Sequence, residues 1–222
     1  MSPGSRVGLA LETATEHVSV AVIGAGGAAR ALVEEAVGHG HTRRLSAMVT
    51  RALAEAGVRP QELDWIASDL GPGSFTGVRV GLATARALAL VSGARPLGAS
   101  SLASLAHAAG AKKSLVVPLV GAGRRDLYAG FFRADGRGRL RLLAAPRVGT
   151  PADLLAAVAE VHALVPDHAV LFVGPGAGRE AQALEAAHPG SARPRSRCFR
   201  RQAARFNIWR PASRARKRSR AA

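Results

Sequence analysis

The spacing of hydrophobic residues changes several times along the first hundred positions. Apolar runs at 7–11, 18–23 and 31–37, separated by turn-prone residues, predict three short antiparallel strands. Residues 42–56 then adopt a helical period, which predicts an amphipathic helix that ends at Gly57. Its apolar face consists of Leu45, Met48, Val49, Ala52, Leu53 and Ala56.

A strand, a glycine-rich loop and a second helix come next. We expect the strand over 65–70, the loop over 71–77 and the helix over 78–91, followed by a short strand near 96–98. Three strands, helix, strand, helix, strand is the element order of an RNase H-like unit. The pattern therefore predicts an α/β fold of the actin-like or RNase H-like kind.

The second half repeats this α/β pattern more loosely. Helices are predicted over 101–109, 152–163 and 178–187, and strands over 115–120, 126–132, 139–148 and 169–173. We expect an N-terminal lobe over 1–100, a smaller lobe over 101–190 and a tail over 191–222. The tail has no hydrophobic period, so we expect it to be disordered.

The loop reads Gly71-Pro72-Gly73-Ser74-Phe75-Thr76-Gly77, and glycine loops ahead of helices can bind phosphate. The dinucleotide motif needs glycine where Thr76 stands, and the P-loop needs Lys and Ser or Thr where Val78 and Arg79 stand. Pro72 likewise breaks a nucleophile elbow around Ser74. A tight turn, with Ser74 or Thr76 capping the next helix, is favoured over a nucleotide site.

Small residues recur every fourth position along the second helix, at Gly77, Gly81, Ala85 and Ala89. Such a ridge allows close approach either by the protein's own sheet or by another helix. In the first helix, Arg43 and Arg44 occupy the first turn, where the helix dipole disfavours cations. They are either solvated or paired with an acidic partner.

Most of the net charge of +16 lies in the tail, where eleven arginines and Lys217 occur without an acid. Phe199, Phe206 and Trp209 alternate with these arginines, which suits RNA binding, but out-of-frame translation is the favoured origin of this segment. A single cysteine, Cys198, excludes an internal disulfide. No apolar stretch is expected to be long enough to span a bilayer, so we expect a cytoplasmic protein.

Catalytic candidates are few. Glu12 and Asp69 end two strands and are the only acids placed to hold a metal-bound nucleotide, but capping of the strand-end turns is favoured over such a site. No histidine or cysteine lies beside Ser74 to activate it. His39 and His41 straddle a turn without a third ligand nearby. We therefore predict no catalytic residue, no metal and no cofactor.

The thirteen residues from Asp69 to Gly81 closely resemble the signature of the TsaB family, formerly called YeaZ. The resemblance covers roughly residues 7 to 185. It includes Leu9 to Thr15, Ser19 to Val22, His41 to Ser46, Val116 to Leu119, Arg124 to Ala129 and Val173 to Gly178.

This resemblance implies an actin-like (ASKHA) fold and a non-catalytic subunit of the machinery that makes threonylcarbamoyladenosine in tRNA. The catalytic subunit TsaD has two metal-binding histidines one helical turn apart, and this chain has no such pair. The family's two N-terminal helices pack against TsaD in a four-helix bundle. The implied interface comprises Arg43, Arg44, Leu45, Met48, Val49, Ala52, Gly77, Val78, Gly81, Leu82, Ala85 and Ala89.

The resemblance also implies that TsaE joins the assembly, that TsaC supplies threonylcarbamoyl-adenylate and that tRNA is met only through the complex. Two states of the chain alone stay open, a homodimer through the same face and a monomer. Two alternatives stay open: an active actin-like ATPase or kinase using Glu12 and Asp69, and an RNA-binding protein driven by its tail.

Overall fold

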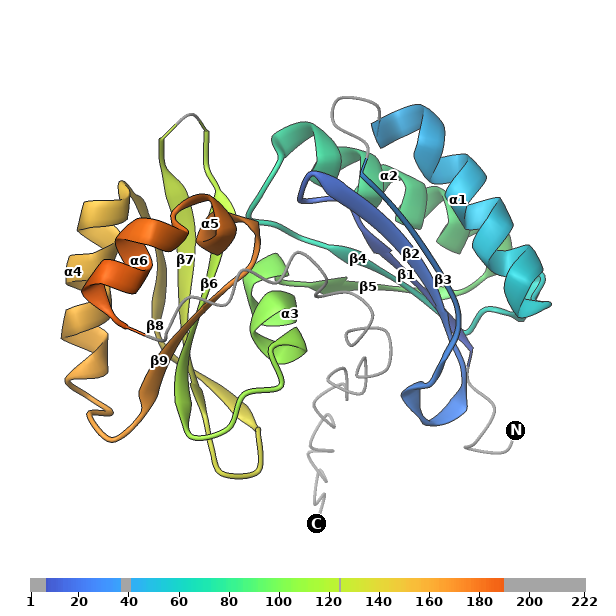
Figure 1. The fold of residues 1–222 in the computed structure, drawn as a ribbon. Helices are drawn as coiled ribbons and strands as arrows, with labels where there is room; N and C mark the ends of the chain where they lie inside the picture. The colour runs from blue at the N-terminus through green and yellow to red at the C-terminus, as the bar shows by residue number, and fades with distance from the viewer. Residues whose placement is uncertain (1–6, 37–40, 124, 190–222) are drawn as a thin grey trace, which may run out of the picture.

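Two α/β lobes, each built on one mixed sheet, make up the part of the chain that the computed structural model describes (Figure 1). That part comprises residues 7–36, 41–123 and 125–189, with 41–43 described by their backbone only. The tail over 191–222, for which we predicted disorder, lies outside it. The predicted α/β fold with two mixed sheets is confirmed.

The first sheet has the strand order β3-β2-β1-β4-β5. Its strands are β1 (Gly8–Glu12), β2 (His17–Ile23), β3 (Ala29–Ala36), β4 (Trp65–Asp69) and β5 (Arg95–Ala99). The first three pair antiparallel, whereas β1, β4 and β5 pair parallel. This arrangement is the RNase H-like topology predicted from the element order. It also brings the ends of β1 and β4, with Glu12 and Asp69, to one edge of the sheet.

Helices α1 (His41–Ala56) and α2 (Phe75–Ser92) lie side by side on one face of this sheet (Figure 1). Leu9, Leu45 and Ile66 are fully buried between the sheet and the helices. Helix α2 begins three residues before the predicted start because Ser74 caps it: the Ser74 Oγ accepts the Gly77 N–H at 3.1 Å. Two short 3-10 turns, Ala25–Gly27 and Pro60–Glu62, were not predicted.

Helix α2 corrects one expectation about composition. Its 18 residues have a mean hydropathy of 1.2, which is long and apolar enough for a membrane span by those two criteria. The expectation that no stretch would reach that length is therefore wrong. In the structure α2 covers the first sheet, but only 22% of its residues are buried. An apolar helix with a largely exposed outer side is thus a feature of the first lobe.

The second sheet has the order β8-β7-β6-β9. Its elements are α3 (Ser101–Ala108), β6 (Ser114–Gly121), β7 (Leu127–Ala134), β8 (Leu140–Gly149), α4 (Pro151–His162), β9 (Ala169–Val173), α5 (Pro175–Arg179) and α6 (Ala181–Ala187). The single helix predicted over 178–187 is wrong, because the helical run starts at Pro175 and breaks at Glu180. The close approach of α5 to β6 needs glycine: a Cβ on Gly176 would lie 2.9 Å from the Leu119 Cβ.

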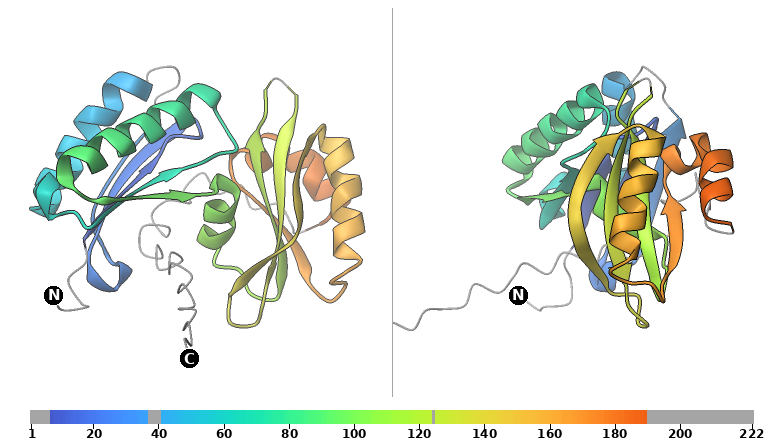
Figure 2. Two further views of the ribbon diagram at one scale, coloured as in Figure 1. Left: turned by 180° about the vertical axis from the view of Figure 1, so that it is seen from behind. Right: turned by 90° about the vertical axis from the view of Figure 1, so that its left-hand side faces the viewer.

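Helices pack on both faces of the second sheet (Figure 2). Side chains of α4, α5 and α6 share one core with Leu115, Phe131 and Phe172. On the opposite face, α3 packs against Val116 and Phe132. The start of α3 also touches the glycine loop, since the Ser101 N–H donates to the Gly71 carbonyl at 3.0 Å. The glycine loop therefore lies where the two lobes meet.

Candidate functional site

The glycine loop joins the end of β4 to the start of α2. Gly71, Pro72 and Gly73 form the connection, Ser74 is the cap, and Phe75, Thr76 and Gly77 make the first turn of α2. The predicted cap at Ser74 is confirmed. The Phe75 side chain is 73% exposed, and the Arg79 guanidinium carbon lies 5.0 Å from the centre of its ring. The first turn of α2 therefore presents a cation stacked on an aromatic ring to solvent.

The inner side of the loop is filled by the protein's own turn after β1, at Thr13 and Ala14. The Ser74 N–H donates to the Ala14 carbonyl at 2.7 Å. A Cβ on Gly77 would clash with the Thr13 carbonyl oxygen, and a Cβ on Gly73 would lie 2.8 Å from the Ala14 Cβ. The glycines are therefore needed so that the loop and α2 can approach this turn closely.

Glu12 and Asp69 lie beside the same turn, and both bind its backbone. The Ala14 N–H donates to the Glu12 carboxylate at 3.0 Å, and the Thr13 N–H and hydroxyl each donate to Asp69 at 3.3 Å. Burial, followed by the charge of Asp69, raises the pKa of Glu12 well above its ordinary value. Burial also raises the pKa of Asp69, which is only 5% exposed.

These contacts determine what the loop can do chemically. A phosphate held by a glycine loop needs free backbone N–H groups and open space above the helix start. Here Thr13 and Ala14 fill the space beneath the loop, the Ser74 N–H is bonded to Ala14, and the Gly77 N–H is bonded to Ser74. Both carboxylates are turned toward this turn. The loop therefore has a structural role: its contacts hold the end of β1, the end of β4 and the start of α2 together.

Most residues of the predicted interface lie inside the first lobe rather than on its surface. Eight of them are buried, namely Leu45, Met48, Val49 and Ala52 on α1 and Gly77, Gly81, Ala85 and Ala89 on α2. The small-residue ridge of α2 faces the protein's own turn and sheet, since a Cβ on Gly81 would lie 3.0 Å from the Ser68 Oγ. In the structure these eight residues are covered by the chain's own turn, sheet and helices, so the interface proposed below is argued from exposed residues of the same two helices.

The remaining four predicted interface residues differ in position. Val78 and Leu82 are partly exposed along one edge of α2. Arg44 is exposed, and its guanidinium donates to the Glu35 carboxylate on β3 at 3.3 Å. The acidic partner of this arginine is therefore a residue of the same lobe, not of another protein. The Arg43 side chain lies outside the described residues, as does His39.

The outer face of these helices is formed by residues that the sequence analysis did not select. On α2 it comprises Phe75, Arg79, Ala83, Arg86, Ala87, Leu90 and Val91, and on α1 Ala47, Thr50 and Ala54. Leu90 is 89% exposed and Val91 is 75% exposed. Their spacing was visible in the sequence, but Arg79 and Arg86 gave this side the pattern of an ordinary solvated face. We call this set the outer helical face.

Comparison with known proteins gives consistent matches. Residues 31–177 match the family model of TsaD, tRNA N6-adenosine threonylcarbamoyltransferase. The chain is 39% identical over 101 residues to the tRNA threonylcarbamoyladenosine biosynthesis protein TsaB of Haemophilus influenzae, covering 46% of this chain and 42% of the relative. The corresponding Escherichia coli protein is 33% identical over 132 residues, covering 59% of this chain and 56% of the relative. The chain thus spans about half the length of these curated relatives.

A solved structure extends the likeness to most of the chain. YeaZ from Pseudomonas aeruginosa superposes with a TM-score of 0.66 at 30% sequence identity. The superposition covers 85% of this chain and 83% of the YeaZ chain. Both lobes, and not only the first, therefore take part in the match.

Proposed function

Because the chain belongs to the TsaB (YeaZ) family, we propose that it is a non-catalytic subunit in the synthesis of threonylcarbamoyladenosine in tRNA, supporting the catalytic subunit TsaD by binding it. The Haemophilus influenzae relative is named for this biosynthesis, and the matching family model is named for the transferase. The observation that carries the proposal is the outer helical face, which leaves an apolar helix open to solvent.

The composition of this face suits helix-to-helix docking. Phe75, Leu90 and Val91 supply exposed apolar area, which on a soluble protein usually marks an interaction site. Between them, Ala83 and Ala87 on α2 are exposed and small. On the neighbouring helix, Ala47 and Ala54 add two more small side chains. Small residues let helix axes approach closely, so two helices of a partner can complete a four-helix layer here.

The non-catalytic part of the proposal is supported by the filled glycine loop. A metal-bound nucleotide at this loop would have to displace Thr13 and Ala14 and break their hydrogen bonds to Asp69 and Glu12. It would also require both buried carboxylates to be ionised and redirected, which burial disfavours. These contacts weigh against the alternative of an active actin-like ATPase.

The proposal includes an assembly in the cytoplasm. TsaE joins the complex of this chain with TsaD, and that complex as a whole receives tRNA. In the absence of TsaD, the outer helical face pairs with a second copy of the chain, because an exposed apolar surface of this kind is usually covered.

The test is co-purification of the chain with TsaD from the same organism. Ala83→Arg places a long cation at the centre of the outer helical face. Its matched control is Ala159→Arg, because Ala159 is also an exposed alanine, on helix α4 of the second lobe. We expect Ala83→Arg to weaken TsaD binding at least about tenfold through steric and desolvation costs, and the control to bind normally.

Both variants should keep the melting temperature of the wild type, because neither side chain is buried. A folded Ala83→Arg variant that binds TsaD as tightly as the Ala159→Arg control would show that this face is not the docking surface.

A further inference from the structure

Two loops lie against each other at the end of the second lobe opposite the β6–β7 connection (Figure 1). One loop, residues 109–113, joins α3 to β6, and the other, residues 135–139, joins β7 to β8. The Lys113 N–H donates to the Asp135 carbonyl at 3.2 Å. A Cβ on Gly138 would lie 3.4 Å from the Ala111 carbonyl oxygen and 3.9 Å from the Lys112 Cγ. The two loops therefore form one continuous surface.

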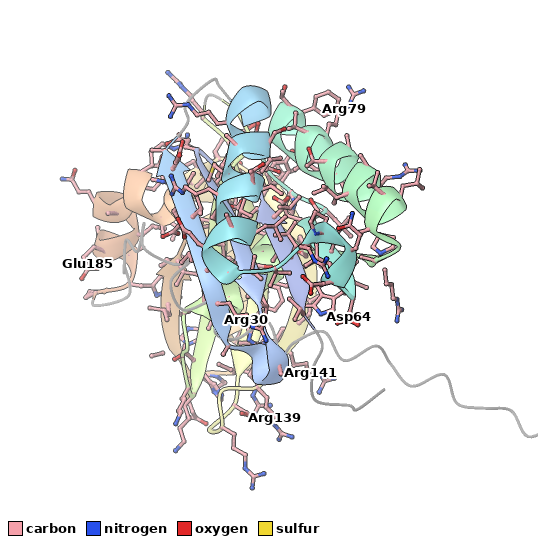
Figure 3. The ribbon with its side chains drawn as sticks, turned by 90° about the vertical axis from the view of Figure 1, so that its right-hand side faces the viewer. Arg30, Asp64, Arg79, Arg139, Arg141 and Glu185 are labelled. Atoms are coloured by element: carbon pink, nitrogen blue, oxygen red, sulfur yellow. The ribbon has the colours of Figure 1, made fainter. Side chains whose placement is uncertain are left out.

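Six exposed cationic side chains lie on these two loops and on the adjoining ends of β7 and β8. They are Lys112, Lys113, Arg133, Arg137, Arg139 and Arg141, and we call them the hairpin-end cluster. Arg133 on β7 lies directly opposite Arg141 on β8 in the antiparallel register. Like charges directly across a strand pair are destabilising, and the Arg133 Nε donates to the His168 Nε2 at 3.4 Å rather than to a carboxylate. Figure 3 shows Arg139 and Arg141 extending from this end of the molecule.

Acidic side chains at this end do not balance the cluster. Asp135 binds Arg139 at 2.7 Å and also accepts from the backbone N–H groups of Arg137 and Arg139. These bonds lower the pKa of Asp135 to about 2, and the bond from the Arg139 backbone has the largest effect. The Asp135 carboxylate is therefore already bonded to residues of its own turn. Asp167 lies in the connection before β9. The first residue of β9, Ala169, pairs with Ser114, so this connection is at the same end of the sheet. Among the described residues of the three connections and the adjoining ends of β7 and β8, Asp135 and Asp167 accompany the six cations of the cluster.

We propose that the hairpin-end cluster binds the phosphate backbone of RNA. Identifying that RNA as tRNA rests on the function proposed above. The cluster extends from the Arg133–Arg141 pair on the two strands to Arg137 in the turn that joins them. A single anion would engage only one part of such a strip, whereas a polyanion engages all of it.

The residues around the cluster specify how the RNA is bound. Segments 110–114 and 133–141 contain no Phe, Tyr or Trp, so base stacking is not provided there. The hairpin turn also lacks the exposed apolar side chains that anchor a protein in a lipid surface. The surface therefore recognises backbone charge without reading sequence, and its binding falls steeply with salt.

The test measures binding of a fluorescent tRNA transcript to the full-length chain over a series of salt concentrations. The hairpin variant is Arg137→Gln/Arg141→Gln. Its matched control is Arg59→Gln/Arg95→Gln, which removes the same charge from two exposed arginines of the first lobe and leaves the basic tail unchanged. We expect the hairpin variant to bind about tenfold more weakly, with a salt dependence reduced by about two phosphate contacts, and the control to change less than about twofold.

Equal weakening by the two variants would overturn the proposal, because it would assign RNA binding to overall charge. So would an unchanged hairpin variant, or a variant that loses binding to phosphatidylserine vesicles while keeping tRNA. Co-purification with TsaD separates this proposal from the previous one. A hairpin variant that still binds TsaD but no longer binds tRNA supports both the proposed function and the RNA-binding proposal. A wild-type chain that does not bind TsaD but binds tRNA through the hairpin refutes only the proposed function.

Discussion

Glu12 and Asp69 hold the turn after β1 by accepting hydrogen bonds from its backbone, yet burial makes their ionised forms costly. Because the pKa of each carboxyl is raised on folding, the folded chain binds these protons more tightly than the unfolded chain. The stability contributed by the pair is therefore largest at acidic pH. It falls as the pH rises from the ordinary carboxyl range through the raised pKa values.

We predict that Glu12→Gln removes the part of this fall that Glu12 causes. The glutamine oxygen can still accept the Ala14 N–H, but it carries no charge to bury and no charge to repel Asp69. At pH 7 the variant should be more stable than the wild type by about 1.4 kcal/mol for each unit of pKa displacement, and the two should converge near pH 4. Urea unfolding at several pH values measures this. As a control, Glu34→Gln at an exposed position of β3 should leave the pH profile unchanged, and a Glu12→Gln profile parallel to the wild type would contradict the interpretation.

At the level of elements, the segment from Asp69 to Gly81 joins the end of β4 to α2 and packs against the turn after β1. We predict that Gly77→Ala lowers the free energy of unfolding by about 1–3 kcal/mol, because its Cβ collides with the backbone of Thr13. Gly121→Ala is the matched control, since its nearest neighbour would be the Arg179 guanidinium at an ordinary 3.7 Å. Denaturant unfolding measures both variants. Equal free energies of unfolding for the two variants would mean that the Thr13 turn can shift at no cost. Gly77 would then not be needed for the close approach of α2.

The helices were predictable from hydrophobic period and capping, but their orientation was not. A ridge of Gly77, Gly81, Ala85 and Ala89 is equally compatible with the protein's own sheet and with a foreign helix. Only the fold brings Thr13 against this ridge from more than sixty residues away in the sequence. For the same reason, the pairing of Arg44 with Glu35 could not be inferred, because it depends on how α1 lies over β3.

For the whole molecule, the two lobes have separate cores, and we keep the division near residue 100 as a proposal. The first lobe carries the outer helical face and the second carries the hairpin-end cluster. This separation lets TsaD docking and RNA contact be altered independently. The overall fold was predictable because the strand and helix order of the first lobe is distinctive, whereas the hairpin-end cluster required the structure to bring two loops together.

Threonylcarbamoyl transfer to tRNA is the measurement that most directly tests a supporting, non-catalytic role. The reaction contains purified TsaD, TsaE, tRNA and threonylcarbamoyl-adenylate, with the wild-type chain, Ala83→Arg, Ala159→Arg or no added chain. We predict product with the wild type and with Ala159→Arg, at least about tenfold less with Ala83→Arg, and none when this chain is incubated without TsaD. Product formed by this chain without TsaD, or full activity with a folded Ala83→Arg, would contradict that role.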